Sequence, residues 1–392
     1  MARSPLAELR GRAPFQVLCA PDKFKGTLTA VSAAEAMARG ARQAGPNVLA
    51  EVCPVADGGE GTLDALVAAQ GATIHHATVT GPLGDPVAAR YGITADGRTA
   101  IVELAEASGL MLVPAGRRVP TLTTTYGTGE LIRIATERGC DAVILGVGGS
   151  ATCDGGLGLV QALGARIWDN GGRRIHQQFR GGMLGLVERV EAPPTLPTIR
   201  VACDVTNPLF GPHGAAFTFG PQKGATPGQV MLLDAGLAHL AAILGGDPHA
   251  TGAGAAGGVG YGLATLCGAR LERGVDLVLD AIGFSGRCEG ADLVLTGEGR
   301  LDEQTLDGKA VAGVAAAAHR TGVPTIAIVG SMGPGAEACT DPAENGLLQR
   351  AIGLAERFGH ERAVREPATL LEAVARMVVA REMQVPSTKD PC

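Results

Sequence analysis

The sequence predicts an α/β protein in which one domain, a doubly wound parallel sheet, carries a second, mixed α/β domain inserted into it. Short apolar runs alternate with alanine-rich stretches of helical periodicity. A chain of 392 residues is too long for one comfortable core. The alternation is regular in about the first 78 and the last 120 residues and changes in between, as an insertion would. We therefore expect residues 1–78 and 275–392 to form one domain and residues 79–274 the other.

The outer segments contain the clearest elements. Ser32 and Glu35 have capping-box spacing in the first helix, and Gly45-Pro46 ends it. The elements predicted there are strands at 15–20, 48–55, 292–295, 325–329 and 351–354, and helices ending near residue 44 and at 63–70, 308–319 and 367–381.

The middle segment has a different texture. It begins with an alternating β-ribbon whose turn is at 81–85, and it contains a stretch of almost pure Gly and Ala at 252–262. The other elements predicted there are the ribbon at 78–94, strands at 100–106, 141–149 and 199–203, and helices at 127–138 and 158–164.

Composition excludes several functions. Aromatic residues make up only 3% of the chain and the net charge is −6 without a basic run, which disfavours nucleic acid as a partner. Nine scattered cysteines without a zinc or CxxC pattern indicate reduced, structural thiols. Residues 1–14 lack the apolar core of a signal peptide, and no apolar window approaches the roughly 20 residues of a membrane span. We expect a soluble, cytoplasmic protein that acts on a small molecule.

Two polar loops follow the first two predicted strands, where open parallel sheets bind ligands. Residues 20–27 offer Asp22, Lys23 and Lys25 for an anionic substrate with a hydroxyl, although a solvated turn with a helix cap would look the same. Residues 57–62 place Asp57 and a second carboxylate beside three glycines. Helix capping is the alternative there, but three glycines exceed what a cap needs.

A third loop, residues 146–156, holds five glycines between a strand and a helix. Gly146, Gly148 and Ala151 match a dinucleotide fingerprint, and Asp169 follows about 20 residues later, which favours a nicotinamide-dependent oxidoreductase as one alternative. The polar residues that prolong this loop argue against the tight turn of that fingerprint.

A fourth cluster consists of Asp204 with Asn207 and then Lys223. The two oxygen-bearing side chains could hold Mg²⁺, and the lysine could meet a phosphate; an Asx turn before Pro208 is the alternative. The second GxGxxG, at 252–257, does not follow a strand and indicates a flexible or closely packed backbone.

The segment 292–309 is the most informative. A strand leads directly into Gly297-Glu298-Gly299-Arg300, followed by Asp302, Thr305 and a Gly-Lys pair that opens a helix. Glycines and a helix N-terminus favour an anion, and carboxylates beside it favour a cation. The pattern predicts a site for a metal-bound nucleotide phosphate. It is not a Walker A loop, because Glu303 stands where that motif requires glycine.

Together these loops resemble the bacterial glycerate kinase family, in the family's order and over roughly residues 15–330. The motifs are APDKFKGT, PVADGGEGT, TGPLGDPV, TTTYGTGELI, GVGGSATCDGGLG, ACDVTNPLFG, FGPQKGAT, GAAGGVG and LTGEGRLDEQTLDGK. The resemblance implies ATP- and Mg²⁺-dependent phosphorylation of D-glycerate, with the 2-position favoured. It also implies a flavodoxin-like domain with an inserted domain and an active site in the cleft between them. Many relatives have serine in place of Lys23, and residues 332–346 fit the family less well.

Site residues are assigned by chemical type. The expected catalytic residues are Asp22, Lys25, Asp57, Asp302 and Lys309. The expected substrate-binding residues are Lys25, Gly58, Gly59, Glu60 and Arg300. The expected cofactor-binding residues are Gly148, Gly149, Ser150, Thr152, Asp154, Gly155, Gly156, Lys223, Gly297 and Thr305. The expected Mg²⁺ ligands are Asp204, Glu298 and Asp302.

Two alternatives stay open beside the kinase. One is the oxidoreductase named above, and the other is a non-catalytic sensor of small hydroxy acids. A homo-oligomer is compatible with everything in the sequence.

Overall fold

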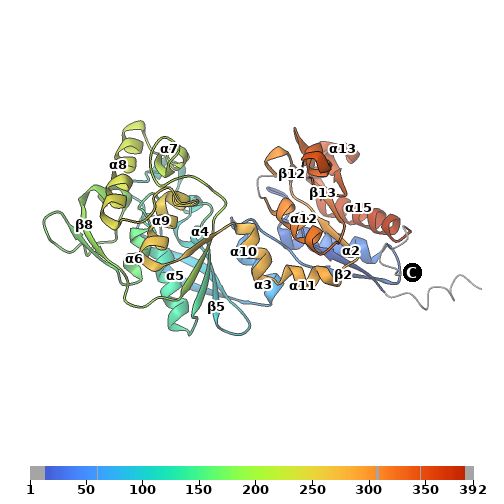
Figure 1. Cartoon of the computed structure of the whole chain (residues 1–392), viewed down its shortest axis with the longest axis horizontal. Helices are drawn as coiled ribbons and strands as arrows, with labels where there is room; N and C mark the ends of the chain where they lie inside the picture. The colour runs from blue at the N-terminus through green and yellow to red at the C-terminus, as the bar shows by residue number, and fades with distance from the viewer. Residues whose placement is uncertain (1–13, 60, 306–308, 345, 385–392) are drawn as a thin grey trace, which may run out of the picture. The chain divides into compact units, whose positions relative to one another are not determined.

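The computed structural model describes residues 14–59, 61–305, 309–344 and 346–384. The chain forms two compact units, one made of Met1–Asp57 and Val278–Cys392 and the other of Gly58–Leu277 (Figure 1). The first division therefore lies at 57/58, earlier in the chain than the predicted 78/79. The helix α3, Thr62–Gln70, belongs to the second unit because its Leu63 amide donates to the Glu103 carboxylate of that unit.

The first unit, unit 1, contains a five-stranded sheet in which all neighbours are parallel. Its order is β2-β1-β11-β13-β15, which is 2-1-3-4-5 when the strands are counted along the unit, as in flavodoxin-like folds. The strands are β1 Phe15–Cys19, β2 Val48–Val52, β11 Leu293–Thr296, β13 Thr325–Val329 and β15 Arg350–Gly353.

Helices cover both faces of this sheet (Figure 1). Residues of α2 (Ala30–Arg42) and α15 (Pro367–Glu382) pack with Ile326 and Ile328 of β13, whereas α12 (Ala310–Arg320) packs with the alternate residues of that strand. Successive side chains of a strand point to opposite faces, so β13 is buried throughout, and all its residues after Thr325 are apolar. Shorter elements complete the unit: α11 Phe284–Glu289, α13 Leu354–Phe358, α14 His360–Arg365, β12 Arg300–Leu301 and β14 Ser331–Met332.

The predicted cap of the first helix is wrong by three residues. Thr29 is the N-cap, and its hydroxyl accepts a hydrogen bond from the Ser32 amide at 3.1 Å. Ser32 therefore lies in the first turn of α2 rather than before it. Thr29 and Ser32 are both good capping residues, and the sequence pattern favoured the wrong one because Glu35 followed at the expected distance.

The second unit, unit 2, contains a six-stranded mixed sheet of order β10-β9-β6-β5-β4-β3. The first four of these strands are mutually parallel, and β4 and β3 run antiparallel around the turn that the sequence predicted. The strands are β3 Thr73–Thr80, β4 Pro86–Ile93, β5 Thr99–Glu103, β6 Ala142–Gly146, β9 Thr198–Ala202 and β10 Arg270–Glu272.

Unit 2 also contains elements that the sequence pattern did not reveal. The hairpin of β7 (Arg166–Asp169) and β8 (Val187–Glu191) is one, and the helix α8 (Pro227–Leu244), which begins with a Thr226–Gln229 capping box, is another. The predicted helices are α5 Tyr126–Glu137 and α6 Leu157–Ala162, and the short helices are α4 Leu104–Ser108 and α7 Ala215–Phe219. The helix α10, Gly274–Ala281, begins in unit 2 and ends in unit 1.

Within the described residues, α8 is the one helix long and apolar enough to cross a membrane by length and composition. It carries Asp234 and His239, and its Leu233, Leu237 and Leu240 are buried in the core of unit 2. A core helix passes the same test, so this helix is weak evidence for a membrane span.

The Gly/Ala segment opens the helix α9, Ala255–Cys267, with three residues of positive φ at 256–258. A Cβ on Gly257 would lie 2.2 Å from the Thr152 carbonyl oxygen, and one on Gly262 would lie 2.2 Å from the Gly155 carbonyl oxygen. The segment is therefore a closely packed support for the loop at 146–156, which was one of the two interpretations of its sequence.

Candidate functional site

The loops after β1 and β11 meet at the topological switch point of the unit 1 sheet, where ligands bind in folds of this order. The backbone joins them: the Ala20 amide donates to Leu295 O at 2.7 Å, and the Asp22 amide donates to Gly297 O at 2.8 Å. The Thr296 hydroxyl donates to Ala20 O at 2.9 Å. Two segments about 275 residues apart thus form one rigid edge, and Asp22 and Glu298 both belong to it.

Asp22 is the buried carboxylate of the first loop, with 7% of its surface exposed. Its Oδ1 accepts the Lys23 amide at 2.6 Å, and Lys23 Nζ lies 3.6 Å from Asp57 Oδ1. Burial raises the pKa of Asp22 to about 6; the Lys23 charge opposes this rise and the Asp57 charge adds to it. The structure shows that Lys23 forms an ion pair with Asp57, whereas the sequence alone left the role of Lys23 open.

Glu298 is the buried carboxylate of the second loop, and it accepts a hydrogen bond from Thr305 Oγ1 at 2.8 Å. Burial raises its pKa to about 7; the Thr305 bond and Lys309 oppose the rise, and Asp22 and Asp302 add to it. Asp302 Oδ1 accepts from Lys309 Nζ at 3.1 Å, and the Asp302 amide donates to Thr305 Oγ1 at 3.2 Å. The predicted residues of this loop therefore form one network.

Two predicted substrate contacts, Lys25 and Arg300, are exposed on the same loops. Arg300 Nε lies 3.8 Å from Asp302 Oδ2. Gly297 has a structural explanation instead of a cofactor contact, since a Cβ there would lie 2.0 Å from Ile328 O. Glycine is needed at this position for the approach of β13.

In unit 2 the loop at 146–156 follows β6, at the carboxyl ends of the parallel strands. Lys223 reaches it from the short helix Pro221–Lys223 and is 3% exposed. Its Nζ donates to Ser150 Oγ and to Thr152 O, each at 2.7 Å. Burial lowers the pKa of Lys223 to about 8, and the nearby Cys153 and Asp154 act in the opposite direction.

Asp154 lies fully inside this loop. Its Oδ2 accepts from the Thr125 amide and hydroxyl, each at 2.8 Å, and its Oδ1 accepts from the Gly156 amide at 3.1 Å. Burial raises its pKa and these hydrogen bonds oppose the rise. Both oxygens hold the protein's own backbone, so the geometry gives Asp154 a supporting role rather than the predicted nucleotide contact. Gly148 and Gly149 lie nearer the surface, whereas Thr152, Gly155 and Gly156 are buried.

Gly58 and Gly59 open the loop that leads to α3. Gly58 has φ +84°, and a Cβ there would lie 2.8 Å from the Ala202 Cβ, so the position requires glycine. The predicted substrate contact Glu60 lies outside the described residues.

Sequence reasoning missed Glu103, a buried carboxylate at the carboxyl end of β5. Its Oε1 accepts the Leu63 amide at 2.6 Å, and burial raises its pKa to about 7. Glu103 thus fixes the start of α3, next to the Gly58–Gly59 loop. An acidic residue in the middle of the predicted strand at 100–106 was the signal that could have found it.

The three predicted Mg²⁺ ligands do not form one group among the described residues, where no set of three or more His, Cys, Asp and Glu side chains has metal-binding geometry. Glu298 and Asp302 are linked through Thr305 in unit 1. Asp204, in unit 2, is exposed and accepts the Gly274 amide at 2.8 Å, at the start of α10. Two linked carboxylates still suit Mg²⁺, which takes one or two in phosphate sites and completes its shell with water and phosphate.

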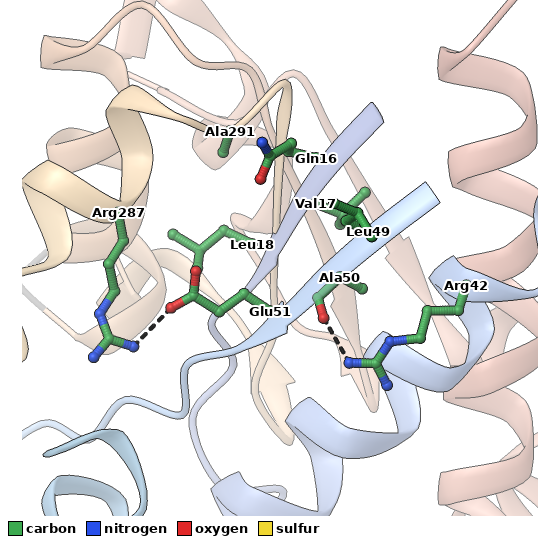
Figure 2. A pocket seen from close by; sticks show the side chains of 9 residues that line it. All are labelled: Gln16, Val17, Leu18, Arg42, Leu49, Ala50, Glu51, Arg287 and Ala291. Carbon is green, nitrogen blue, oxygen red and sulfur yellow. Dashed lines mark hydrogen bonds and ion pairs between the residues drawn. The ribbon is translucent and has the colours of Figure 1, made fainter. Parts of the chain in front are cut away.

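A separate hollow of about 350 Å³ lies over β1 and β2 (Figure 2). Its two guanidinium groups are engaged: Arg287 pairs with Glu51 at 2.9 Å, and Arg42 donates to Ala50 O at 2.6 Å. It contains none of the predicted site residues, and Gln16 places it toward the amino end of β1. The hollow is therefore a poorer candidate than the carboxyl edge.

Comparison with known proteins identifies the family. The model of the glycerate kinase family matches residues 17–383. A glycerate kinase of Bacillus subtilis is 45% identical over 379 residues, covering 93% of this chain and 97% of its own length. A glycerate 2-kinase of Escherichia coli is 46% identical over 328 residues, covering 81% and 86%. A crystal structure from Salmonella typhimurium LT2, provisionally named glycerate kinase 2, superimposes with a TM-score of 0.82 at 41% identity and covers 94% and 98%. The chain belongs to the glycerate kinase family of enzymes.

Proposed function

We propose that this enzyme transfers the γ-phosphoryl group of ATP, with Mg²⁺, to the 2-hydroxyl of D-glycerate. The observation that carries the proposal is the pair of buried carboxylates, Asp22 and Glu298, at the switch point of the unit 1 sheet. Burial raises the pKa of each carboxylate, and the Asp22 charge adds to the rise at Glu298.

Asp22 is the proposed general base. A carboxylate whose pKa is about 6 is mostly ionised at neutral pH and is a stronger proton acceptor than an ordinary aspartate. The glycerate hydroxyl gives its proton to Asp22 as its oxygen bonds to the γ-phosphorus and the bond to the β-phosphate oxygen breaks. Asp57 and Lys23, which form an ion pair beside Asp22, help to set this pKa.

The glycerate carboxylate is assigned to the exposed cations of the same edge, Lys25 and Arg300. Arginine suits a carboxylate because its planar guanidinium can donate two parallel hydrogen bonds. The loop at 58–60 is the second substrate-binding segment in this proposal.

Mg²⁺ supplies charge neutralisation and alignment of the phosphates. Glu298 and Asp302 would hold it in unit 1. The fit is one of charge: burial raises the pKa of Glu298, the Asp22 and Asp302 charges add to that rise, and these three carboxylates face the one ammonium of Lys309. A bound cation relieves that repulsion.

The ATP phosphates are assigned to the glycine loop at 148–156. The support is the loop's place at the carboxyl end of β6 and its tightly bonded backbone. The loop runs for ten residues between β6 and α6, longer than the tight turn of a dinucleotide fingerprint, which disfavours the oxidoreductase.

The test is ³¹P NMR of the purified protein with ATP, Mg²⁺ and D-glycerate. A new phosphomonoester coupled to one proton supports the 2-phosphate, which is also the position in the name of the Escherichia coli relative. Coupling to two protons means the 3-phosphate and overturns the regiochemistry. A folded protein that binds glycerate but forms no ester overturns the kinase proposal and leaves the sensor.

A further inference from the structure

The glycine loop of unit 2 contains a buried lysine whose partners are neutral oxygens. Lys223 Nζ donates to Ser150 Oγ and Thr152 O at 2.7 Å, and no carboxylate oxygen lies within ion-pair distance of it among the described residues. The titratable groups that face it are Cys153 and Asp154. A charge buried in this way lowers the stability of the fold unless an interaction with an opposite charge or a ligand offsets its desolvation.

The hydrogen bond from Lys223 fixes what the Ser150 hydroxyl can do. A serine hydroxyl has one proton to donate and two acceptor sites. Since an ammonium group can only donate, it occupies an acceptor site of Ser150 Oγ and turns the hydroxyl proton away from itself. Ser150 is buried, with 7% of its surface exposed, and in the described part of the chain its hydroxyl proton has no acceptor.

The backbone around Ser150 is held on both sides. Ser150 forms a β-bridge with Gly109, and the Leu110 amide donates to Gly149 O at 2.8 Å. The Ala151 amide donates to Ser108 O at 2.9 Å, and the Thr123 hydroxyl donates to Ala151 O at 3.0 Å. A donor held this firmly needs little reorganisation when a ligand arrives.

We propose that Ser150 is the ligand-facing donor of this loop, that it donates to a phosphate oxygen of the nucleotide, and that Lys223 is a positioning residue that polarises Ser150 without touching the ligand. This inference rests on the proposed function for the identity of the ligand. It replaces the predicted direct contact between Lys223 and phosphate, because the Lys223 ammonium is buried behind Ser150 and Thr152.

The pairing of Lys223 with Ser150, called the relay below, predicts two pH dependences of opposite sign, one for nucleotide affinity and one for the free energy of unfolding. Burial lowers the pKa of Lys223 to about 8, so the charge that polarises Ser150 is lost as the pH rises through 8, and nucleotide affinity falls. The free energy of unfolding changes in the other direction. Between pH 8 and about 10.5 the unfolded chain binds the proton that the folded chain has released, so stability rises with pH.

The experiment measures ADP binding by calorimetry from pH 7 to 9.5 with wild type, Ser150→Ala, Lys223→Met and the double variant. We expect each single variant to bind ADP about 10- to 100-fold more weakly at pH 7, as for loss of a charge-assisted hydrogen bond. The double variant should lose no more than either single one, because the two residues act as a unit. The fall in affinity near pH 8 should be absent from all three.

Thr226→Ala is the matched control, since it removes a neutral hydroxyl of unit 2 that caps α8 rather than holding the loop. It should lower Tm while leaving the ADP affinity and its pH dependence unchanged. If Lys223→Met does not fold, Lys223→Arg and Ser150→Ala decide the question: the arginine variant should keep most of the affinity and lose the fall near pH 8.

Additive losses, normal ADP affinity in Ser150→Ala, or a pH profile that survives in Lys223→Met would each overturn the relay. An increase in the KM for glycerate with unchanged ADP affinity would overturn the phosphate assignment. If the wild type forms phosphoglycerate but the Ser150 and Lys223 variants bind ADP normally, only this inference fails. Wild type that shows the ADP pattern but forms no phosphoglycerate means that only the proposed function fails.

Discussion

The polar network at the switch point of unit 1 and the glycine loop of unit 2 consist of different kinds of chemical groups. The network consists of ionisable side chains: Asp22, Glu298 and Asp302 with Lys309 and Arg300 around them. The loop consists mainly of backbone amides and buried hydroxyls, with one cation, Lys223, and one carboxylate, Asp154, that binds the protein's own backbone. Both lie at the carboxyl ends of parallel strands.

The difference corresponds to two chemical demands of phosphoryl transfer. A proton acceptor and a metal site need groups whose charge state can change, and the carboxylates of unit 1 have pKa values raised to about 6 and 7. A cradle for an anion needs groups that keep their positions, and the loop's hydrogen bonds provide that. The following variants are expected to disable one region and leave the other intact.

Asp22→Asn removes the proposed base and should have the largest effect. We expect kcat to fall by about 10²- to 10⁴-fold. In wild type, activity should rise with pH as Asp22 loses its proton near pH 6, and this limb should be absent from the variant. The pH profile of kcat/KM checks this, and ADP affinity should stay normal. Turnover within threefold of wild type would remove Asp22 from the mechanism.

Asp302→Asn should lower kcat by about 10²- to 10³-fold through loss of a metal ligand and of the charged partner of Lys309. Glu303→Gln, at the exposed neighbouring position, is the control and should retain activity. Turnover should be measured over a range of Mg²⁺ concentrations, because a ligand variant should need more metal. An unchanged Mg²⁺ dependence would argue against coordination by Asp302.

Gly257→Ala should disrupt the glycine loop without touching unit 1. The φ of +73° and a Cβ 2.2 Å from Thr152 O combine strain with a backbone clash, and we expect a loss of about 2–5 kcal/mol in the free energy of unfolding. Gly268→Ala, which has φ +63° and no atom near its Cβ, isolates the strain alone at about 1–2 kcal/mol. Urea unfolding measures both, and equal losses would show that the contact with Thr152 is unimportant.

Glu298→Gln should change how stability depends on pH. The folded-state pKa is raised from 4.5 to about 7, so the folded chain holds a proton that the unfolded chain releases, and stability falls as pH rises between these values. The total is up to about 3 kcal/mol. The variant should show a flatter profile, and Mg²⁺ should raise the Tm of wild type more at pH 8 than at pH 5.5. A wild-type profile that is flat in this window would contradict the raised pKa.

Thr226→Ala should have the smallest effect, and it serves as a control for general destabilisation of unit 2. It removes the capping box of α8 and should cost about 1 kcal/mol of stability in unit 2. Activity and ADP affinity should match wild type at 25 °C. A loss of ADP affinity here would mean that the loop responds to general destabilisation, and the interpretation of Gly257→Ala would then change.

Much of the fold was predictable because its strands are short apolar runs that end in polar loops. β13 was predicted at its observed bounds, and β1 and β11 within one residue at each end. The hairpin β7–β8 and the helix α8 were missed: α8 is apolar on most sides and has little periodicity, and β7 and β8 are irregular and partly exposed.

The site was predictable only by residue type. The sequence correctly placed polar residues at strand ends, and the structure joins Glu298, Thr305, Asp302 and Lys309 into one network. It could not show that Asp154 faces inward or that Lys223 is buried behind Ser150, because burial is set by packing from distant segments such as α5 and α9. Glu103 was missed because its partner, Leu63, lies 40 residues away.

The strand order of unit 1 also has a consequence for how the chain is made. β1 lies between β2 and β11, yet 240 residues, 53–292, separate the end of β2 from the start of β11. At about 5–20 residues per second, a ribosome takes roughly 12–50 s to synthesise them. During that time β1 has only one of its two neighbours, whereas the strands of unit 2 are made consecutively and can pair as they emerge. The segment that bears Asp22 thus waits for its second neighbour until residues 53–292 have been made.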